Sequence, residues 1–292
     1  MGKILITGAT GNLGNAIAQQ IIVRQGADNL VVMFRKLHKA SQAFFEAGAE
    51  LRYGDYDNIA TLIKAFRGID KLFMVASSEI AKRCVQHTNI VEAAKIAGVK
   101  HIIYTSYIRS VEDASSPLAY LGAGHLAAEK AIFESEIPFT ILKQSVFFEN
   151  IPWLIGKDIF EKGSLVFPAN DGSVGFVSRE DLVEASDNIL LENGHEFKDY
   201  KLTGSQKYTF KDIAQMLSEL SGKNIKYISP KPEEYLAMKE KEGIALEDLD
   251  KPLAFAKAIA QGESDFAGDD LEKILKRKPK AIQAFLKEAY RL

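Results

Sequence analysis

The stretch from Lys3 to Gly14 constrains the fold more than any other part of the chain. Its apolar run Ile4–Ile6 predicts a buried strand, and glycines at positions 8, 11 and 14 then lead into apolar residues at helical spacing. Glycine permits a sharp turn and a close approach of a pyrophosphate to the backbone, and the first N–H groups of a helix point at such an anion. A strand, a glycine turn and a helix start in this order predict a dinucleotide site that includes Gly8, Gly11 and Gly14.

The alternation of strand and helix continues through the first half of the chain. Further apolar runs predict strands at residues 29–34, 50–53, 71–75, 100–104 and 139–142, and helices at 40–47, 59–66, 80–97 and 118–134. Strands that alternate with helices form a parallel sheet through right-handed crossovers, with helices on both faces. The predicted class is therefore α/β, a doubly wound parallel sheet of the Rossmann type.

The rhythm changes after Asn150. Residues 151–153 and the glycine-rich stretch at 163–175 look like loops and short strands, and a helix follows that Ser178 or Asp181 is expected to cap. Residues 200–204 predict a strand that rejoins the sheet, Thr209 begins a clean amphipathic helix, and the chain beyond Pro230 has helical character. We predict a nucleotide-binding domain at 1–150, returns to the sheet near 176–206, and a smaller C-terminal substrate lobe at 151–292.

Composition narrows the class of partner. With 37 Lys and Arg against 39 Asp and Glu, the formal charge is −2, which gives no electrostatic footprint for nucleic acid or an anionic membrane. No apolar run is long enough for a membrane span, and the first strand starts at once, so we expect a cytoplasmic protein. The single cysteine, Cys84, lies three residues before His87, but no Cys- or His-rich cluster accompanies them, and no metal site is predicted.

Ligands of parallel α/β sheets bind beyond the carboxyl ends of the strands. That rule nominates the polar residues that follow the predicted strands: Arg35, Asp55, Ser77, Ser78, Ser106 and Gln144.

Arg35 decides between the two nicotinamide coenzymes. In the usual arrangement, a carboxylate about twenty residues past the glycines holds the ribose 2′-hydroxyl of NAD. Here the second strand ends in Arg35 and Lys36, and a guanidinium pairs well with a 2′-phosphate. The inference is NADP(H), with Lys36 and Lys39 as further cations near the pocket. Asp55 either accepts a hydrogen bond from the adenine amino group or is an ordinary turn aspartate.

Taken together, the ordered motifs resemble the NmrA-like group of atypical short-chain dehydrogenases, in particular its bacterial NADPH:quinone oxidoreductases. The resemblance is carried by Thr7–Gly14, Arg35, Ser77-Ser78-Glu79, Tyr104-Thr-Ser106, His125-x-x-x-Glu129-Lys130 and Val177-Ser-Arg179-Glu-Asp181, and it runs to Lys278-Pro279 and Phe285-Leu286. It implies pyrophosphate contacts from Gly8, Gly11, Asn12 and Leu13, contacts to the nicotinamide-side ribose from Ser77, Ser78 and Glu79, a nicotinamide and substrate site at Lys143, Gln144 and Phe147, and a cofactor contact from Arg179.

One departure from related dehydrogenases bears on the chemistry. Classical members use Tyr-x-x-x-Lys on the helix after the fifth strand, with the tyrosine as proton donor. If His125 takes the lysine position, Leu121 stands where the tyrosine should be, and the neighbouring Tyr120 is turned about 100° around the helix. Alcohol oxidation and sugar epimerisation are therefore disfavoured.

Quinone reduction fits this departure, because the oxyanion formed is acidic enough to take its proton from water or a weak donor. His125 and Gln144 are the candidate donors near the developing charge, and the alternative for His125 is a ring that simply packs or hydrogen-bonds. Phe147, Phe148 and Trp153 form either an aromatic wall for a flat substrate or plain core.

Two functions remain open from the sequence: an NADPH-dependent reductase of quinone-like acceptors, and an NADP(H)-binding redox sensor without turnover. A nucleotide-sugar epimerase ranks below both, and a homo-oligomer is left open.

Overall fold

The computed structural model describes residues 2–36 and 39–292, with the backbone alone for residues 39–41. The chain divides into two compact units. Unit 1 comprises residues 1–107, 120–144 and 182–201, and unit 2 comprises residues 108–119, 145–181 and 202–292. The predicted division at residue 150 stays a prediction, but the last part of unit 1 comes from a segment that rejoins it late in the sequence.

Unit 1 is built on a seven-stranded sheet of order β3-β2-β1-β4-β5-β6-β9, and every pairing among its first six strands is parallel. Its strands are β1 (Ile4–Ile6), β2 (Leu30–Phe34), β3 (Glu50–Tyr53), β4 (Lys71–Met74), β5 (His101–Tyr107), β6 (Phe139–Gln144) and β9 (Lys198–Leu202), and its helices are α1 (Asn12–Gln25), α2 (Lys39–Glu46), α3 (Ile59–Phe66), the 3₁₀ turn η1 (Ile80–Lys82), α4 (Arg83–Ala97), α5 (Ala119–Ser135) and most of α8 (Arg179–Leu191). The doubly wound α/β class is confirmed.

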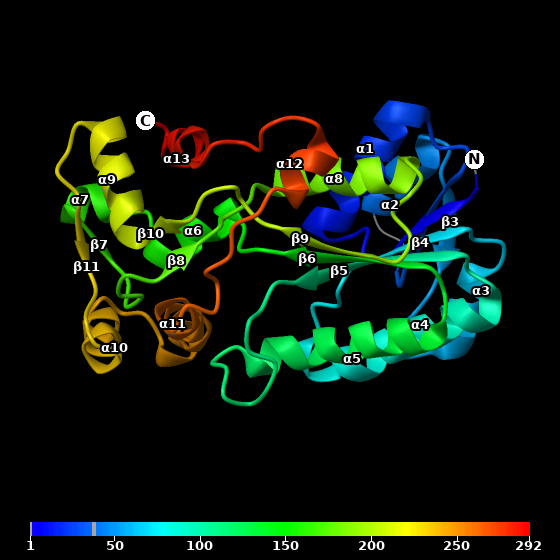
Figure 1. Ribbon diagram of the computed structural model, residues 1–292, viewed down its shortest axis with the longest axis horizontal. Helices are drawn as coiled ribbons and strands as arrows, with labels where there is room; N and C mark the ends of the chain where they lie inside the picture. Colours follow the sequence, from blue (N-terminus) through cyan, green and yellow to red (C-terminus); the bar gives the residue numbers. More distant parts are fainter. Residues whose placement is uncertain (1, 37–38) are drawn as a thin grey trace. The chain divides into compact units, whose positions relative to one another are not determined.

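Helices cover both faces of this sheet. Figure 1 shows α3, α4 and α5 on one face, with α1 and α8 on the other. The strands β1 and β2 are buried along their whole length, and Leu72 and Ile102 lie in the same apolar core as Ile90 of α4. Because both faces are covered, the carboxyl ends of the strands are left as the edge at which polar side chains gather.

Unit 2 has only short strands among its described residues, and most of its regular structure is helical. Its elements are η2 (Phe148–Asn150), α6 (Ile151–Ile155), α7 (Ile159–Lys162), β7 (Ser164–Val166), β8 (Ser173–Val174), β10 (Tyr208–Thr209), α9 (Phe210–Ser221), β11 (Lys226–Ile228), α10 (Pro232–Lys241), α11 (Leu246–Ala260), α12 (Asp270–Leu275) and α13 (Ile282–Tyr290). The strand pairs β10-β8 and β11-β7 form two small sheets, and a separate apolar core joins Phe167, Phe210 and Leu217.

Helix α9 begins after Thr209, as predicted, and both of its ends are capped. The Thr209 hydroxyl accepts a hydrogen bond from the backbone N–H of Asp212, whose side chain in turn accepts from the backbone N–H of Thr209. Gly222 closes the helix in a left-handed conformation with φ +69°.

Three predicted elements differ from the structure. The single helix expected at 80–97 is divided into η1 and α4. The fifth strand does not end at Tyr104, because its register with β6 continues to the pair of Tyr107 with Gln144, so Ser106 lies inside the strand and donates to Glu129. The loop expected at 151–153 is wrong, because Pro152 suits the first turn of a helix whose Ile151 and Leu154 are buried.

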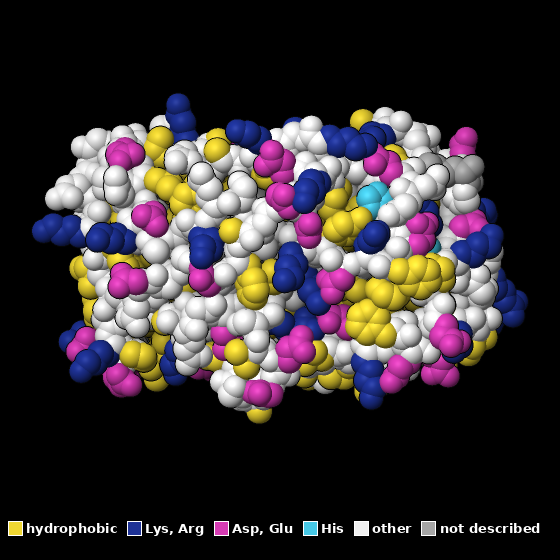
Figure 2. Space-filling model, in the orientation of Figure 1, with side chains coloured by type: hydrophobic (Ala, Val, Ile, Leu, Met, Phe, Trp, Pro, Cys, Tyr) yellow, Lys and Arg dark blue, Asp and Glu magenta, His cyan; other side chains and the backbone are white. Residues whose placement is uncertain are grey.

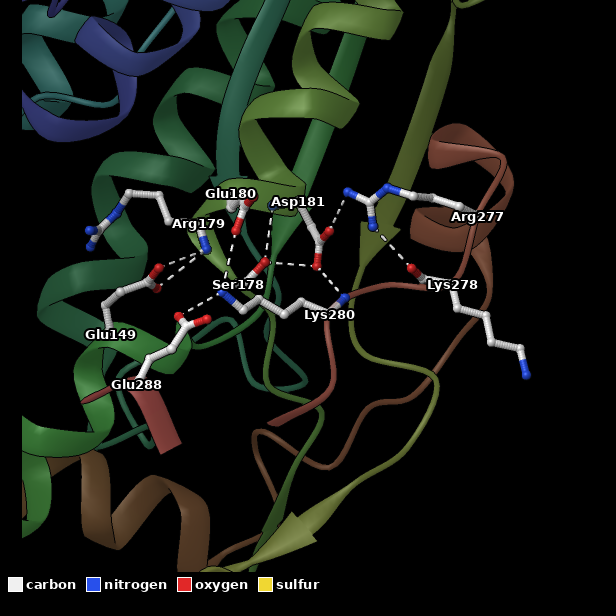
Figure 3. A network of polar contacts seen from close by, with 9 residues as sticks. All are labelled: Glu149, Ser178, Arg179, Glu180, Asp181, Arg277, Lys278, Lys280 and Glu288. Carbon is white, nitrogen blue, oxygen red and sulfur yellow. Dashed lines mark hydrogen bonds and ion pairs between the residues drawn. The ribbon is translucent and has the colours of Figure 1, made fainter. Parts of the chain in front are cut away.

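The start of α8 is held to the C-terminal segment inside unit 2. Ser178 caps the helix by accepting a hydrogen bond from the N–H of Asp181, at 3.0 Å. The buried Asp181 carboxylate accepts from the backbone N–H of Lys280 at 2.7 Å and pairs with Arg277 at 2.8 Å, as Figure 3 shows. This network brings the Val-Ser-Arg-Glu-Asp motif together with the segment around Lys278-Pro279, about a hundred residues later in the chain.

Candidate cofactor and acceptor site

The glycine turn after β1 has the geometry that the sequence predicts. Gly8 has φ +62°, a left-handed conformation that favours glycine, and its carbonyl accepts a hydrogen bond from Gly11 N–H at 2.9 Å. Gly14 lies one turn into α1, where an added Cβ would stand 2.6 Å from the Gly8 oxygen. The third glycine therefore allows the helix to pack directly on the turn.

The start of α1 offers hydrogen-bond donors without protein partners. Within the described part of the chain, no acceptor is recorded for the backbone N–H groups of Asn12 and Leu13, and Gly11 provides no side-chain cap. The first turn holds no acidic residue, so nothing competes with an anion for the positive end of the helix dipole. These residues fit the pyrophosphate of a dinucleotide.

Next to this turn lies a cavity of about 210 Å³ at the carboxyl ends of β1, β2, β3 and β4. It combines the glycine turn and a charged rim with apolar side chains, and it is lined by Gly8, Thr10, Gly11, Met33, Phe34, Arg35, Gly54, Tyr56, Val75, Ala76, Ser77, Ser78 and Glu79. Tyr56 was not predicted from the sequence. Burial raises the pKa of its phenol to about 12, so the hydroxyl stays protonated.

The charged rim of the cavity pairs Arg35 with Glu79. The Arg35 Nη1 atom lies 2.7 Å from Glu79 Oε1, and the exposed fractions of the two side chains are 54% and 37%. The hydrogen bond and charge of Arg35 lower the pKa of Glu79. Lys36 does not line the cavity, and the side chain of Lys39 lies outside the described residues.

This ion pair bears on one predicted role. The sequence resemblance implies Glu79 at the nicotinamide-side ribose, whereas the side chain pairs here with Arg35, 2.7 Å away. The contact of Glu79 with the nicotinamide-side ribose stays a prediction.

Asp55 has the hydrogen bond of a turn aspartate, and its contact with the adenine amino group stays a prediction. Its carboxylate accepts a hydrogen bond from the N–H of Asp57 at 3.1 Å, which is the pattern of a turn aspartate, and the residue does not line the cavity although its neighbours Gly54 and Tyr56 do.

The part of the cavity wall at Ser77 is held in place by hydrogen bonds from the first turns of α4. The Ser77 N–H donates to His87 Nε2 at 3.0 Å, and its carbonyl accepts from Arg83 Nε at 2.7 Å. Its hydroxyl donates to Gln86 Oε1 and accepts from Glu79 N–H. Every polar group of Ser77 is thus held, and these bonds set the path of the chain toward Ser78 and Glu79.

Arg83 is a buried guanidinium without a carboxylate partner in the described structure. Only 6% of the residue is exposed, and its hydrogen-bonding partners are the Ser77 carbonyl and His125 Nε2, the latter 3.2 Å from Nη1. Burial lowers the pKa of Arg83. A buried charge without a carboxylate partner is costly, and Arg83 is held by its two hydrogen bonds at the edge of the sheet.

His125 lies in the same polar network. Its Nε2 lies 3.2 Å from Arg83 Nη1, and its Nδ1 lies 2.8 Å from the Tyr104 hydroxyl. Both nitrogens therefore have protein partners. The role of His125 as a hydrogen-bond donor to a substrate stays a prediction. It requires the ring to give up one of these two protein partners.

Sequence reasoning predicted no part in this network for Arg83, His87 or Tyr104. The available signal was that Arg83 and His87 are four residues apart and so share one helix face, whereas Cys84 is exposed and His87 is buried. Among residues 2–36 and 39–292, no group of three or more metal-ligating side chains occurs.

Gly124 makes this network sensitive to a single methyl group. A Cβ at Gly124 would lie 2.5 Å from Arg83 Cγ, so Gly124→Ala is expected to displace Arg83 and release Ser77. We expect a loss of about 1–3 kcal/mol in stability from overpacking and roughly tenfold weaker NADPH binding, an affinity change of about 1.4 kcal/mol.

The measurement is urea unfolding combined with nucleotide titration. Gly122→Ala on the same helix is the matched control, because its Cβ would meet only the Tyr107 hydroxyl at 3.5 Å, an ordinary contact. Equal behaviour of the two variants would show that Arg83 does not hold the wall.

Two buried histidines make stability depend on pH. Burial lowers the pKa values of His87 and His101 from 6.5 to about 4. Between pH 6.5 and pH 4 the unfolded chain binds more protons than the native state, so stability is complete above pH 6.5 and is lost as pH falls. We expect a loss on the order of 2 kcal/mol per histidine at pH 5.

Urea midpoints at pH 7 and pH 5 measure this loss. His87→Gln should show a smaller difference between the two midpoints than the unsubstituted chain, and a difference that is unchanged would refute the assignment to His87.

At the carboxyl end of β6, Lys143 and Gln144 differ in availability. The Lys143 ammonium pairs with Asp199 of β9 at 2.6 Å, and successive residues of a strand point to opposite faces. Gln144 is 5% exposed, and its Nε2 is buried without a hydrogen-bond partner in the described residues. An orphaned buried donor at this edge favours Gln144, and disfavours the Lys143 side chain, as a ligand-binding group.

The aromatic residues after β6 have different partners. Phe147 lies under the guanidinium of Arg179, which is 5.5 Å from the ring centroid, so these two predicted residues are brought together in unit 2. Phe148 is buried and stacks on Phe285, whereas Trp153 is half exposed and makes a T-shaped contact with Phe255. Phe148 belongs to the apolar core of unit 2, and its predicted contact with the substrate stays a prediction.

The charges on the surface are mixed in sign, in agreement with the formal charge of −2. Figure 2 shows lysine and arginine interspersed with aspartate and glutamate over the face drawn. Across the described residues, no helix combines the length and apolarity that a bilayer span requires.

Comparison with known proteins gives a match to a family and to single relatives. The model of the NmrA-like family matches residues 1–286. Quinone oxidoreductase 2 of Escherichia coli is 36% identical over 224 residues, which cover 77% of this chain and 76% of the relative.

Solved structures extend the likeness over nearly the whole chain. A triphenylmethane reductase from Citrobacter, solved with NADP(H), has a TM-score of 0.87 at 33% identity and covers 98% of this chain and 99% of its own. NmrA, a negative transcriptional regulator solved with NADP, has a TM-score of 0.77 at 14% identity over 99% of this chain and 96% of its own, which indicates a shared fold alone.

Proposed function

Because the chain belongs to the NmrA-like family, we propose that it is an NADPH-dependent oxidoreductase that reduces quinones or similar electron-poor acceptors. One observation carries the proposal: a guanidinium, Arg35, lines the same cavity as a glycine turn that leads into a helix with unpartnered N–H groups. This is the combination that an NADP(H) phosphate ester and pyrophosphate require. The names of the similar quinone and dye reductases agree with it.

The chain's own residues account for binding and positioning. Asn12 and Leu13 would hold the pyrophosphate through backbone N–H groups, and Arg35 would hold the 2′-phosphate. When bound, NADPH supplies the hydride. Gln144 would then donate a hydrogen bond from its unpaired Nε2 to the acceptor oxygen on which negative charge develops.

No strong acid is required from the protein. The Tyr-x-x-x-Lys positions hold Leu121 and His125, and the adjacent Tyr120 is exposed. A reduced quinone oxygen is acidic enough to take its proton from water, so positioning is the main contribution of the site. The same reasoning disfavours alcohol oxidation and epimerisation.

The alternative is a redox sensor that binds NADP(H) without turnover. It is favoured by the engagement of both His125 nitrogens within the protein. We further propose a small-molecule acceptor as the partner and leave the oligomeric state to a hydrodynamic measurement.

The test is NADPH oxidation, followed at the nicotinamide absorbance, with a panel of small quinones and triphenylmethane dyes. Turnover that falls about tenfold or more in Gln144→Leu, with unchanged NADPH affinity, is the expected result. Tight NADPH binding without turnover on any acceptor would refute the reductase and favour the sensor.

A further inference from the structure

The cavity rim contains both a cation and a carboxylate, the two kinds of side chain by which dinucleotide-binding folds select a coenzyme. NADPH and NADH differ only at the 2′ position of the adenosine ribose, where a phosphate selects a cation and a hydroxyl selects a carboxylate. Arg35 and Glu79 both line the cavity and lie 2.7 Å apart. The carboxylate does not come from the end of β2, as it usually does, but from the segment that follows β4.

We propose that Glu79 sets coenzyme choice, a step that rests on the proposed function. Glu79 accepts the hydrogen bond of the 2′-hydroxyl when NADH binds, and it opposes the 2′-phosphate when NADPH binds. The chain therefore uses both coenzymes, and Glu79 limits its preference for NADPH. The pair with Arg35 is the resting arrangement, which the phosphate must break by drawing the guanidinium to itself.

Lys82 is placed to pair with the Glu79 carboxylate when Arg35 leaves it. Its Nζ lies 3.7 Å from Glu79 Oε2 and 3.0 Å from Asp57 Oδ2. When Arg35 turns to the phosphate, Lys82 keeps a positive charge beside Glu79 and reduces its repulsion of the ligand. Lys82 should therefore matter for NADPH and little for NADH.

The backbone of Glu79 is fixed well enough for this role. Its N–H donates to Ser77 Oγ at 3.1 Å, and Ser77 is held in turn by Gln86, His87 and Arg83. The carboxylate can exchange partners while its main chain keeps its position.

The experiment compares Glu79→Gln with the unsubstituted full-length chain. Dissociation constants for NADPH and NADH are measured by nicotinamide fluorescence at low ionic strength, without any acceptor. We expect NADPH to bind about fivefold more tightly and NADH about five- to tenfold more weakly, because glutamine keeps the shape but loses the charge. Glu134→Gln, which removes an exposed carboxylate from α5, is the control for net charge and should change neither constant.

A second variant tests the exchange of partners. Lys82→Met should weaken NADPH about fivefold with NADH unchanged, and this effect should vanish when Glu79→Gln is already present, since no carboxylate remains to be neutralised.

Parallel shifts of both coenzymes in Glu79→Gln, or unchanged NADH binding, would overturn the inference and leave the proposed function intact. Failure of the unsubstituted chain to bind either coenzyme would instead refute the proposed function.

Discussion

Replacing Gly14 with alanine is expected to reduce NADPH affinity by at least 100-fold, equivalent to about 2.7 kcal/mol. The added Cβ would stand 2.6 Å from the Gly8 oxygen and 2.8 Å from its carbonyl carbon, and both are backbone atoms that no side-chain rotation can move away. Helix α1 must then shift from the turn, which separates its N–H groups from the glycine loop. We also expect a loss of about 3 kcal/mol in unfolding free energy, at the upper end for overpacking.

Titration with NADPH and urea unfolding measure the two effects. Gly122→Ala is again the control, because it places the same methyl group on a helix without a clash and should leave stability unchanged or slightly raised. Native affinity in Gly14→Ala would mean that the phosphates do not bind at this turn.

The second large effect is expected from Arg35→Ala. NADPH should bind about 1.5–3 kcal/mol more weakly, the scale of a hydrogen bond to a charged group, while NADH affinity stays nearly constant. The variant removes the cation that attracts the 2′-phosphate and leaves Glu79 in the cavity to repel it.

Parallel titrations with the two coenzymes measure this difference. Arg67→Ala, which removes an equal charge just beyond the end of α3, should leave both affinities unchanged. Equal losses for both coenzymes in Arg35→Ala would place the phosphate pocket elsewhere.

The sequence predicts the regular part of this fold well, and the reason is local. Most of the strands β1 to β6 are short apolar runs bounded by glycines and polar residues, and α3 and β3 match their predicted bounds. The short helix α6 was missed because Pro152 and nearby glycines read as loop signals, although proline suits a first helical turn.

The site is predicted less completely, because its decisive contacts join distant residues. Arg35 was nominated from its place after a strand and Glu79 from the family resemblance, but their pairing depends on the order β2-β1-β4 and on loop paths that no local pattern specifies. The hydrogen bond from Ser77 N–H to His87 depends in the same way on how α4 packs. By contrast, the divergence of Lys143 and Gln144 follows from the pleat of a strand alone.

Arg83 contacts both the nucleotide wall, through Ser77, and the ring of His125. On the proposed function, a substitution of His125 is expected to change coenzyme binding as well, because one guanidinium contacts both the histidine and Ser77. Laboratory selection for altered substrates should accordingly randomise positions 83 and 125 as a pair, and libraries that vary either alone will recover few improved catalysts.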